Sequence, residues 1–272
     1  MKAFLSRLPP EAGASLTRFL PEQEKQQLES FPLLEEPLTL EKFSNEGMLD
    51  KVHWSWFLPT LKLYPESEQK LFLSALSPHA EKNLAKALTL SIGGEKVTEV
   101  GKAFLRKILL DSLMGPKDQM LPRPYLPPSK LKRLLNLTKK ELTHLIERLS
   151  IYDLNAELRQ IIETKMLKKI YSFLSEEERT LLKNMGPHKD TFVLGRMGLE
   201  KWDGSEESLR TLMHKRGLVR FGAGLSGQDP DFIWTLCHQL DIGRGTALYK
   251  LCMQEPIHAV TDAIIAQIEE NV

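Results

Sequence analysis

The chain has 272 residues, of which 42% are hydrophobic and 27% are charged, a composition typical of a folded globular protein and not of a disordered one. Its 37 Lys and Arg residues balance 36 Asp and Glu residues, so no overall charge draws it to nucleic acid or to an anionic membrane surface. The longest apolar runs, such as 108–110, are far shorter than the roughly 20 residues that span a bilayer, so we expect no direct membrane insertion.

The N-terminus and the cysteines indicate the compartment. The first residues, MKAFLSRLPPEAG, contain no continuous apolar stretch of the kind found in secretory signal peptides, so we expect no signal peptide. Cys237 and Cys252 allow at most one disulfide, and without an export signal we expect both to be reduced thiols. We therefore predict a cytoplasmic protein.

Two stretches in the first third of the chain, FLSRLPPEAGASLTRFL (4–20) and FLSALSPHAEKNLAKAL (72–88), align without gaps at an offset of 68 residues. Both read as the end of a helix followed by a second helix that begins at a proline, with leucines on the buried side. Eight aligned pairs are identical: Phe4/Phe72, Leu5/Leu73, Ser6/Ser74, Leu8/Leu76, Pro10/Pro78, Ala12/Ala80, Leu16/Leu84 and Leu20/Leu88. Stacked helical arrays use such units, so we predict a repeat-like helical assembly.

The clearest break in the chain is the segment 115–129, GPKDQMLPRPYLPPS, with five prolines and one glycine. Such a segment cannot be helical inside and favours an extended backbone. It is either a linker between two helical regions, 1–114 and 130–272, or a strap across one of them.

The C-terminal region contains strong helix signals. Thr138 with Glu141, and Ser175 with Glu178, form predicted capping boxes, in which side chain and backbone satisfy each other's free polar groups. Pro230 after Asp229 fits a first helical position behind an N-cap. Period-2 strand patterns are absent, so we predict an all-α fold, a repeat-like bundle of helices with the Pro-rich extended connection in its middle.

The sequence GAGLSG, with Gly222, Gly224 and Gly227, matches the G-x-G-x-x-G pattern of dinucleotide-binding sites. That site needs a strand before the glycines and a βαβ unit around them, whereas the preceding residues read as a helix. We therefore interpret the glycines as permitting close helix packing and a turn before Asp229, and we expect no nucleotide cofactor.

Three sets of residues are candidate metal ligands. Glu141–His144 and Glu255–His258 both have the E-x-x-H spacing of di-iron bundles, but each glutamate falls at a predicted helix start. Cys237, His238, Cys252 and His258 lack the paired spacing that lets one turn supply two zinc ligands, and Cys237 reads as a core residue. We expect no metal, no cofactor and no catalytic site.

The stretch KVHWSWFLPTLKLYP (51–65) holds two of the four tryptophans beside a histidine. It could be an aromatic recognition site, a catalytic histidine in an apolar wall, or a helix entry packed into a core. Ser55 can cap a helix there, and His53 has no acidic or nucleophilic neighbour in the sequence, so we favour the helix entry. Two residues along a helix turn a side chain by about 200°, so we predict that Trp56 is buried and Trp54 exposed.

Two blocks of sequence resemble a known family. HWSW (53–56), followed by a leucine-rich helix, is similar to the N-terminal His-x-Ser-Trp segment of the SctK/YscK/OrgA family of type III secretion sorting-platform accessory proteins, with Trp54 where the family form carries proline. Residues 209–251 resemble that family's C-terminal helical block. The matching positions there are Arg216, Gly217, Trp234, Leu240, Asp241, Arg244 and Gly245.

The repeat also looks like the leucine-proline-alanine helix pairs of FliG-type flagellar motor switch proteins. The resemblances imply an all-helical, non-enzymatic cytosolic adaptor without a cofactor, held peripherally at the inner membrane through protein contacts. Its implied partners are the cytoplasmic domain of the inner-membrane ring and the pod and stalk proteins. The alternatives are a helical regulatory or chaperone-like binding module unrelated to secretion, and an enzyme whose site residues form no linear motif.

Partners of such an adaptor would recognise exposed helix faces or loops. The acidic arm 30–48 and the acidic turn that contains Trp202 are the candidate contact segments. A tryptophan among charged residues can serve as an interface anchor, so we name Trp54 and Trp202 as candidate partner contacts. For Trp202, packing against its own domain is the competing interpretation.

Overall fold

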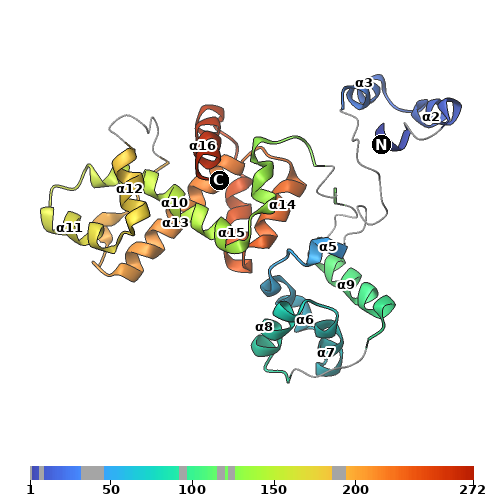
Figure 1. Cartoon of the computed structure of the whole chain (residues 1–272), viewed down its shortest axis with the longest axis horizontal. Coiled ribbons are helices and arrows are strands. Elements are labelled where there is room, and N and C mark those ends of the chain that lie inside the picture. The colour runs from blue at the N-terminus through green and yellow to red at the C-terminus, as the bar shows by residue number, and fades with distance from the viewer. Residues whose placement is uncertain are drawn as a thin grey trace. The chain divides into compact units, whose positions relative to one another are not determined.

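The computed structural model describes residues 2–5, 9–31, 46–91, 97–114, 120–121, 126–185 and 194–272. Fifteen α-helices and three short 3₁₀-helices make up the secondary structure of these residues, and no strand occurs among them, so the predicted all-α fold is confirmed (Figure 1). None of the helices in the described ranges is long and apolar enough to cross a membrane. The chain divides into two compact units, Met1–Gly47 and Met48–Val272.

The first unit contains α1 (Lys2–Leu5), α2 (Pro10–Thr17) and α3 (Glu22–Ser30). Pro10 opens α2, as its position behind a second proline predicts. None of the described side chains of this unit is buried. Helix α5 (Glu46–Leu49) crosses the boundary between the units. Residues 32–45 of the predicted acidic arm lie outside the described residues.

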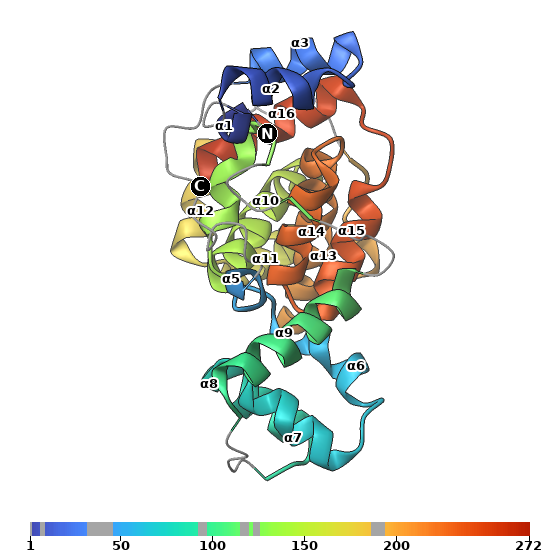
Figure 2. The ribbon, with the colours of Figure 1, turned by 90° about the vertical axis from the view of Figure 1, so that its right-hand side faces the viewer.

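The second unit begins with a group of short helices, which Figures 1 and 2 show close together. They are η1 (Trp54–Phe57), α6 (Leu58–Leu61), α7 (Glu66–Ser74), α8 (Pro78–Leu88) and α9 (Glu99–Met114). Ser77 caps α8 by accepting a hydrogen bond from the backbone N–H of Ala80. Leucines and aromatic residues from all five elements form a small apolar cluster, to which α14 adds Trp234. We call these elements the N-terminal helical group.

The rest of the second unit is a larger bundle. Its elements are η3 (Lys130–Asn136), α10 (Lys139–Leu158), α11 (Thr164–Phe173), α12 (Glu176–Asn184), η4 (Leu199–Lys201), α13 (Glu206–Leu225), α14 (Pro230–Gln239), α15 (Ile242–Cys252) and α16 (His258–Asn271). Both predicted capping boxes, at Thr138 and Ser175, are present. The stripe Leu142, Leu145, Ile146 and Leu149 is fully buried where α10 packs on α13. We call this bundle the C-terminal helical group.

Glycines allow two of these helices, α15 and α16, to approach α13 closely. A Cβ atom at Gly222 would lie 2.5 Å from Leu251 Cβ on α15, and one at Gly224 would lie 2.7 Å from Ile268 Cδ1 on α16. Gly227 has φ +81° in the turn before Asp229, a conformation that favours glycine. The prediction that GAGLSG serves packing and a turn is therefore confirmed.

A buried ion pair links α10 to α13. Asp153 accepts from Arg220 at 2.7 Å and pairs with Arg216 at 3.0 Å, and Gln267 on α16 accepts from Arg220 at 2.6 Å. Charged groups buried in this way are stable only when paired and hydrogen-bonded. Near the end of α10, Glu157 accepts hydrogen bonds from the backbone N–H groups of 197–199 and holds that loop against the helix.

The observed division of the chain lies between Gly47 and Met48, so residues 48–114 belong to the same unit as 130–272. Of the Pro-rich segment, 115–119 and 122–125 lie outside the described residues. Leu121, inside that segment, donates its backbone N–H to Asp231 of α14 at 3.0 Å. Whether the segment acts as a linker or a strap stays a prediction.

Candidate functional site at the junction of the two helical groups

The residues 53–56 meet the residues 238–242 in the second unit, although more than 180 positions separate them in sequence. Three hydrogen bonds join the two segments. The backbone N–H of His53 donates to the carbonyl of His238 at 2.8 Å, the indole Nε1 of Trp56 donates to the carbonyl of Leu240 at 2.9 Å, and the backbone N–H of Ile242 donates to Ser55 Oγ at 2.9 Å. This contact is the junction.

Each side of the junction is a helix start. His53 precedes η1 with an extended backbone, and its ring lies beside Ser55. Asp241 is the N-cap of α15 and accepts from the backbone N–H of Arg244 at 3.2 Å. Helix starts leave backbone N–H groups without partners inside the helix, and here Ser55 and Asp241 satisfy two of them.

An aromatic stack fills the apolar side of the junction. The ring of His238 lies between Trp56, at a centroid distance of 4.0 Å, and Trp234, at 3.8 Å. Burial lowers the pKa of His238 to about 4, although its hydrogen bond to the Trp234 carbonyl acts in the opposite direction. The ring is therefore neutral at pH 7, and its Nδ1–H donates to that carbonyl because a carbonyl can only accept.

Gly245 sets how closely α15 approaches this stack. A Cβ atom there would collide with the backbone carbonyl oxygen of Cys237 on α14 and would lie 2.6 Å from Cζ2 of Trp56. A side chain at this position would push α15 away from α14 and from η1. Gly245 is therefore required by close packing and not by a special backbone conformation.

Charged and polar side chains cover the other side of the junction. Lys139, at the start of α10, lies 2.9 Å from Nε2 of His53 and 3.6 Å from Asp241 Oδ2. Arg244 donates to Asp241 at 2.9 Å and to Nε2 of His214 at 3.0 Å. Two cations thus share one carboxylate and also donate to two neutral imidazoles.

Burial and the neighbouring charges together explain the protonation state of His53. Burial, followed by the Lys139 ammonium, lowers the pKa of His53 to about 4. An ammonium can only donate, so Nε2 of His53 accepts and the ring proton lies on Nδ1, 2.8 Å from Ser55 Oγ. In this tautomer Nδ1 carries the proton and cannot accept a hydrogen bond from the backbone N–H of Ser55, which lies 3.3 Å away.

The pKa values of two neighbours shift for related reasons. Burial and the Arg244 guanidinium lower the pKa of His214. Burial by itself raises the pKa of Asp241, but the backbone N–H and guanidinium of Arg244, together with Lys139, outweigh burial and lower it. Asp241 is therefore a stable anion that holds the two cations at the junction.

The residues that carry the family resemblance, in 53–56 and 209–251, lie in two separate places in the structure. His53, Ser55, Trp56, Trp234, Leu240, Asp241, Arg244 and Gly245 all lie at the junction. Arg216 and Gly217 lie elsewhere, where α13 crosses α10. Arg216 binds Asp153 and donates to the Gly195 carbonyl at 3.1 Å, and a Cβ atom at Gly217 would collide with the backbone carbonyl of Ile146.

The predicted difference in exposure between Trp54 and Trp56 is wrong, because both side chains are half-buried. Residues 54–57 form a 3₁₀-helix, and the Trp54 ring packs on the small apolar cluster and lies 5.1 Å from the ring of His53. Trp202 is also half-buried. Its ring packs at 6.3 Å, edge to face, on Phe173, and its indole N–H donates to the Ser205 carbonyl at 2.8 Å.

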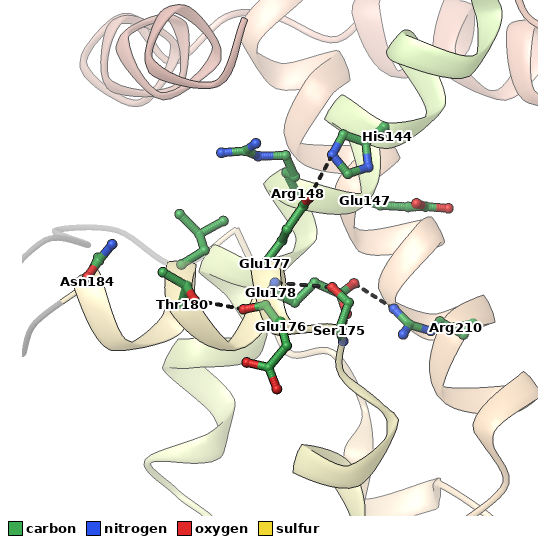
Figure 3. Close-up of a pocket in the computed structure, with 11 residues that line it drawn as sticks. His144, Glu147, Arg148, Ser175, Glu176, Glu177, Glu178, Thr180, Asn184 and Arg210 are labelled. Carbon is green, nitrogen blue, oxygen red and sulfur yellow. Dashed lines mark hydrogen bonds and ion pairs between the residues drawn. The ribbon is translucent and has the colours of Figure 1, made fainter.

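The other histidine considered for chemistry, His144, lines a hollow of about 760 Å³ between α10, α12 and α13 (Figure 3). Its Nε2 lies 3.5 Å from Glu177, while Glu178 binds Arg210 at 2.6 Å and closes the capping box of α12. The lining residues are His144, Glu147, Arg148, Ser175, Glu176, Glu177, Glu178, Thr180, Leu181, Asn184 and Arg210. Several of the polar side chains that line this hollow form ion pairs and hydrogen bonds with one another.

The metal candidates are not brought together. Glu141 accepts from the backbone N–H of Thr138 at 2.6 Å in its capping box, so its carboxylate is engaged at the helix start. Within the part of the chain that the structure describes, no three His, Cys, Asp or Glu side chains are placed to hold a metal ion. Cys237 and Cys252 are buried free thiols, and their mutual hydrogen bond, with burial, raises the pKa of Cys237.

Sequence reasoning missed part of the junction. From the sequence, His238 was proposed only as a zinc ligand, and neither Lys139 nor His214 was identified. The available signal was the spacing of Trp234 and His238, four residues apart on one helix, which places both on one face. No protein-family model, curated protein or solved structure matches this chain.

Proposed function

We propose that this chain is a non-enzymatic structural adaptor of a type III secretion sorting platform. In this role it bridges the cytoplasmic domain of the inner-membrane ring to pod and stalk components, and is peripheral to the membrane through these protein contacts. One observation supports the proposal above all others. Eight positions that carry the family resemblance, drawn from two blocks at opposite ends of the second unit, converge on a single junction.

A bridge must keep the distance between its two partners fixed, and the junction serves that requirement. It joins the N-terminal and C-terminal helical groups by three hydrogen bonds, an aromatic stack and a shared carboxylate. Trp234 comes from α14 yet is buried in the apolar cluster of the N-terminal helical group. Relative rotation of the two groups would break all of these contacts together, so the junction opposes such a rotation.

The histidines of the junction fit a structural role better than a catalytic one. Both ring nitrogens of His53 are engaged, by Lys139 and by Ser55, and the His238 ring is enclosed between two tryptophans. A general base needs a nitrogen that can reach a substrate proton. Specific protein partners would instead bind outer helix faces of about 600–800 Å² per side.

The test is co-purification of the tagged full chain from cells that contain the secretion system, after gentle lysis and crosslinking. We expect ring components and pod or stalk components in the same captured complex. Trp56→Ala should loosen the junction and lower the joint capture of both sides, whereas Ile162→Ser, which changes a side chain that is 97% exposed outside the junction, should not. Capture of no ring, pod or stalk component would refute the proposal and favour the regulatory or chaperone-like alternative.

A further inference from the structure

The two helical groups of the second unit have separate apolar cores. Every extensive helix–helix contact among the described residues lies within one group, such as α7 with α8 or α10 with α13. Across the boundary, Trp234 of α14 packs into the core of the N-terminal helical group, and the junction supplies the hydrogen bonds. A connection that is small beside the two cores can open while each core stays folded.

Two histidines of the junction act as hydrogen-bond acceptors for cations. Nε2 of His53 accepts from the Lys139 ammonium at 2.9 Å, and Nε2 of His214 accepts from the Arg244 guanidinium at 3.0 Å. A neutral imidazole has one acceptor nitrogen, whereas an imidazolium can only donate. Protonation of either ring would therefore replace a hydrogen bond by a contact between two cations.

Two carboxylates and a third histidine also lie near these rings. Asp241 on α15 favours protonation of both rings, and Glu147 on α10 favours protonation of His214. His79 on α8 disfavours protonation of His53. Burial and the adjacent cations outweigh the two carboxylates, so the pKa of each ring is lowered and both stay neutral while the junction is closed.

The ring of His238 is also held neutral, for a different reason. It lies between the rings of Trp56 and Trp234, where a charged imidazole would lose its hydration. Burial therefore lowers the pKa of His238 to about 4, although the hydrogen bond from Nδ1 to the Trp234 carbonyl favours proton uptake. This ring gains a proton readily only when the stack opens to water.

We propose that the junction is an acid-sensitive hinge: proton uptake by His53, His214 and His238 opens it while the C-terminal helical group stays folded. At neutral pH the rings accept from cations or stack on tryptophans, and these contacts close the hinge. In the open state each ring meets water and titrates near its ordinary pKa of about 6.5. The open state thus binds more protons, and acid favours it. The proposal does not rest on a role in secretion.

The size of the effect follows from the pKa values. For His53 the pKa rises from about 4 in the closed state to about 6.5 in the open state, and the same holds for His238. Each ring therefore raises the equilibrium constant for opening about 22-fold between pH 7 and pH 5, and the two together raise it about 500-fold.

The test is amide hydrogen exchange of the full chain between pH 7 and pH 4.5, corrected for the intrinsic rate at each pH. The backbone N–H of Ile242, which donates to Ser55 across the junction, reports on the hinge, and that of the fully buried Leu149 reports on the C-terminal helical group. Protection of Ile242 should fall about 500-fold between pH 7 and pH 5. Leu149 should stay better protected throughout, and the far-UV helix signal should persist to pH 5.

Variants assign the protons. His53→Gln keeps an acceptor for Lys139 but binds no proton, and His238→Phe keeps an aromatic ring in the stack. Each should remove about 22-fold of the pH dependence at Ile242. His258→Gln, which changes an exposed histidine at the start of α16, should leave the pH dependence unchanged.

A second measurement needs no variant. In the wild-type chain, the NMR signals of the His53 and His238 rings should titrate over the same pH range in which Ile242 loses protection. Loss of Ile242 protection together with the far-UV helix signal would overturn the proposal, because the junction would then open only when the whole unit unfolds. Protection of Ile242 that is independent of pH would also overturn it, as would full pH dependence in the His53→Gln, His238→Phe double variant.

Discussion

Gly245→Ala tests the packing of the junction directly, because the chain contains its own control two residues away. At Gly245 an added Cβ atom would collide with the Cys237 carbonyl oxygen and lie 2.6 Å from the Trp56 ring. At Gly243, on the same turn of α15, the added atom would meet only Asp241 Oδ1, at an ordinary distance of 3.5 Å. Both glycines are helical and neither has a positive φ, so backbone strain does not separate them.

We expect Gly245→Ala and Gly243→Ala to change the free energy of unfolding in opposite directions. Overpacking by one methyl-sized group costs about 1–3 kcal/mol, and alanine gains up to about 1 kcal/mol over glycine in a helix. At Gly245 the obstacle is backbone of α14, which cannot rotate away, so we take the upper cost and expect a net loss of about 2 kcal/mol in the free energy of unfolding. At Gly243 only the gain applies, and we expect an increase of about 0.5 kcal/mol.

Urea unfolding followed by tryptophan fluorescence measures both changes. All four tryptophans, at positions 54, 56, 202 and 234, lie in the second unit, so their emission reports on the unit that contains the junction. Combining Gly245→Ala with Trp56→Phe should recover only part of the loss, because the collision with the Cys237 carbonyl persists. If Gly245→Ala were as stable as Gly243→Ala, the close approach of α15 to α14 and η1 would be refuted.

Three further changes probe neighbouring contacts. Trp56→Ala should lower the free energy of unfolding by about 3 kcal/mol, since it removes the indole hydrogen bond and the stacking on His238, while Trp54→Ala should cost about half as much; equal losses in urea would contradict this difference. The free energy of unfolding should fall as the pH drops from 6.5 toward 4, because the histidines bind protons in the unfolded state, whereas the lowered pKa values of His53 and His238 keep them neutral in the folded state. His53→Gln should therefore flatten the pH dependence of the urea midpoint, and an unchanged pH dependence would argue against this role of His53. Glu157→Gln should cost about 1–2 kcal/mol and speed hydrogen exchange of the backbone N–H groups that its carboxylate binds, and unaltered exchange would count against that role.

Local features of the fold could be predicted from the sequence because their causes are local. The capping boxes at Thr138 and Ser175 need only residues three positions apart, and both form as expected. The role of Gly222 and Gly224 in packing followed from the absence of a strand before them. In each case the alternatives differ within a few residues of sequence.

The junction could not be predicted from local sequence features. Its hydrogen bonds join residues about 185 positions apart, and no periodicity specifies which helix start faces which. The family resemblance pointed to 53–56 and to 209–251 separately, without stating that they meet. For the same reason the burial of Trp54 and Trp56 was mispredicted, because it depends on neighbours supplied by distant parts of the chain.

The type of atom used at the junction has a consequence for how the sequence can change in evolution. On the C-terminal side, all three cross-junction hydrogen bonds end on backbone atoms, at His238, Leu240 and Ile242. Mutations at Leu240 or Ile242 can therefore keep these bonds, whereas on the N-terminal side two of the three bonds need the side chains of Ser55 and Trp56. Distant relatives that share this contact should keep a short Ser-Trp signature, while the side chains at the positions of Leu240 and Ile242 are free of this hydrogen-bonding requirement.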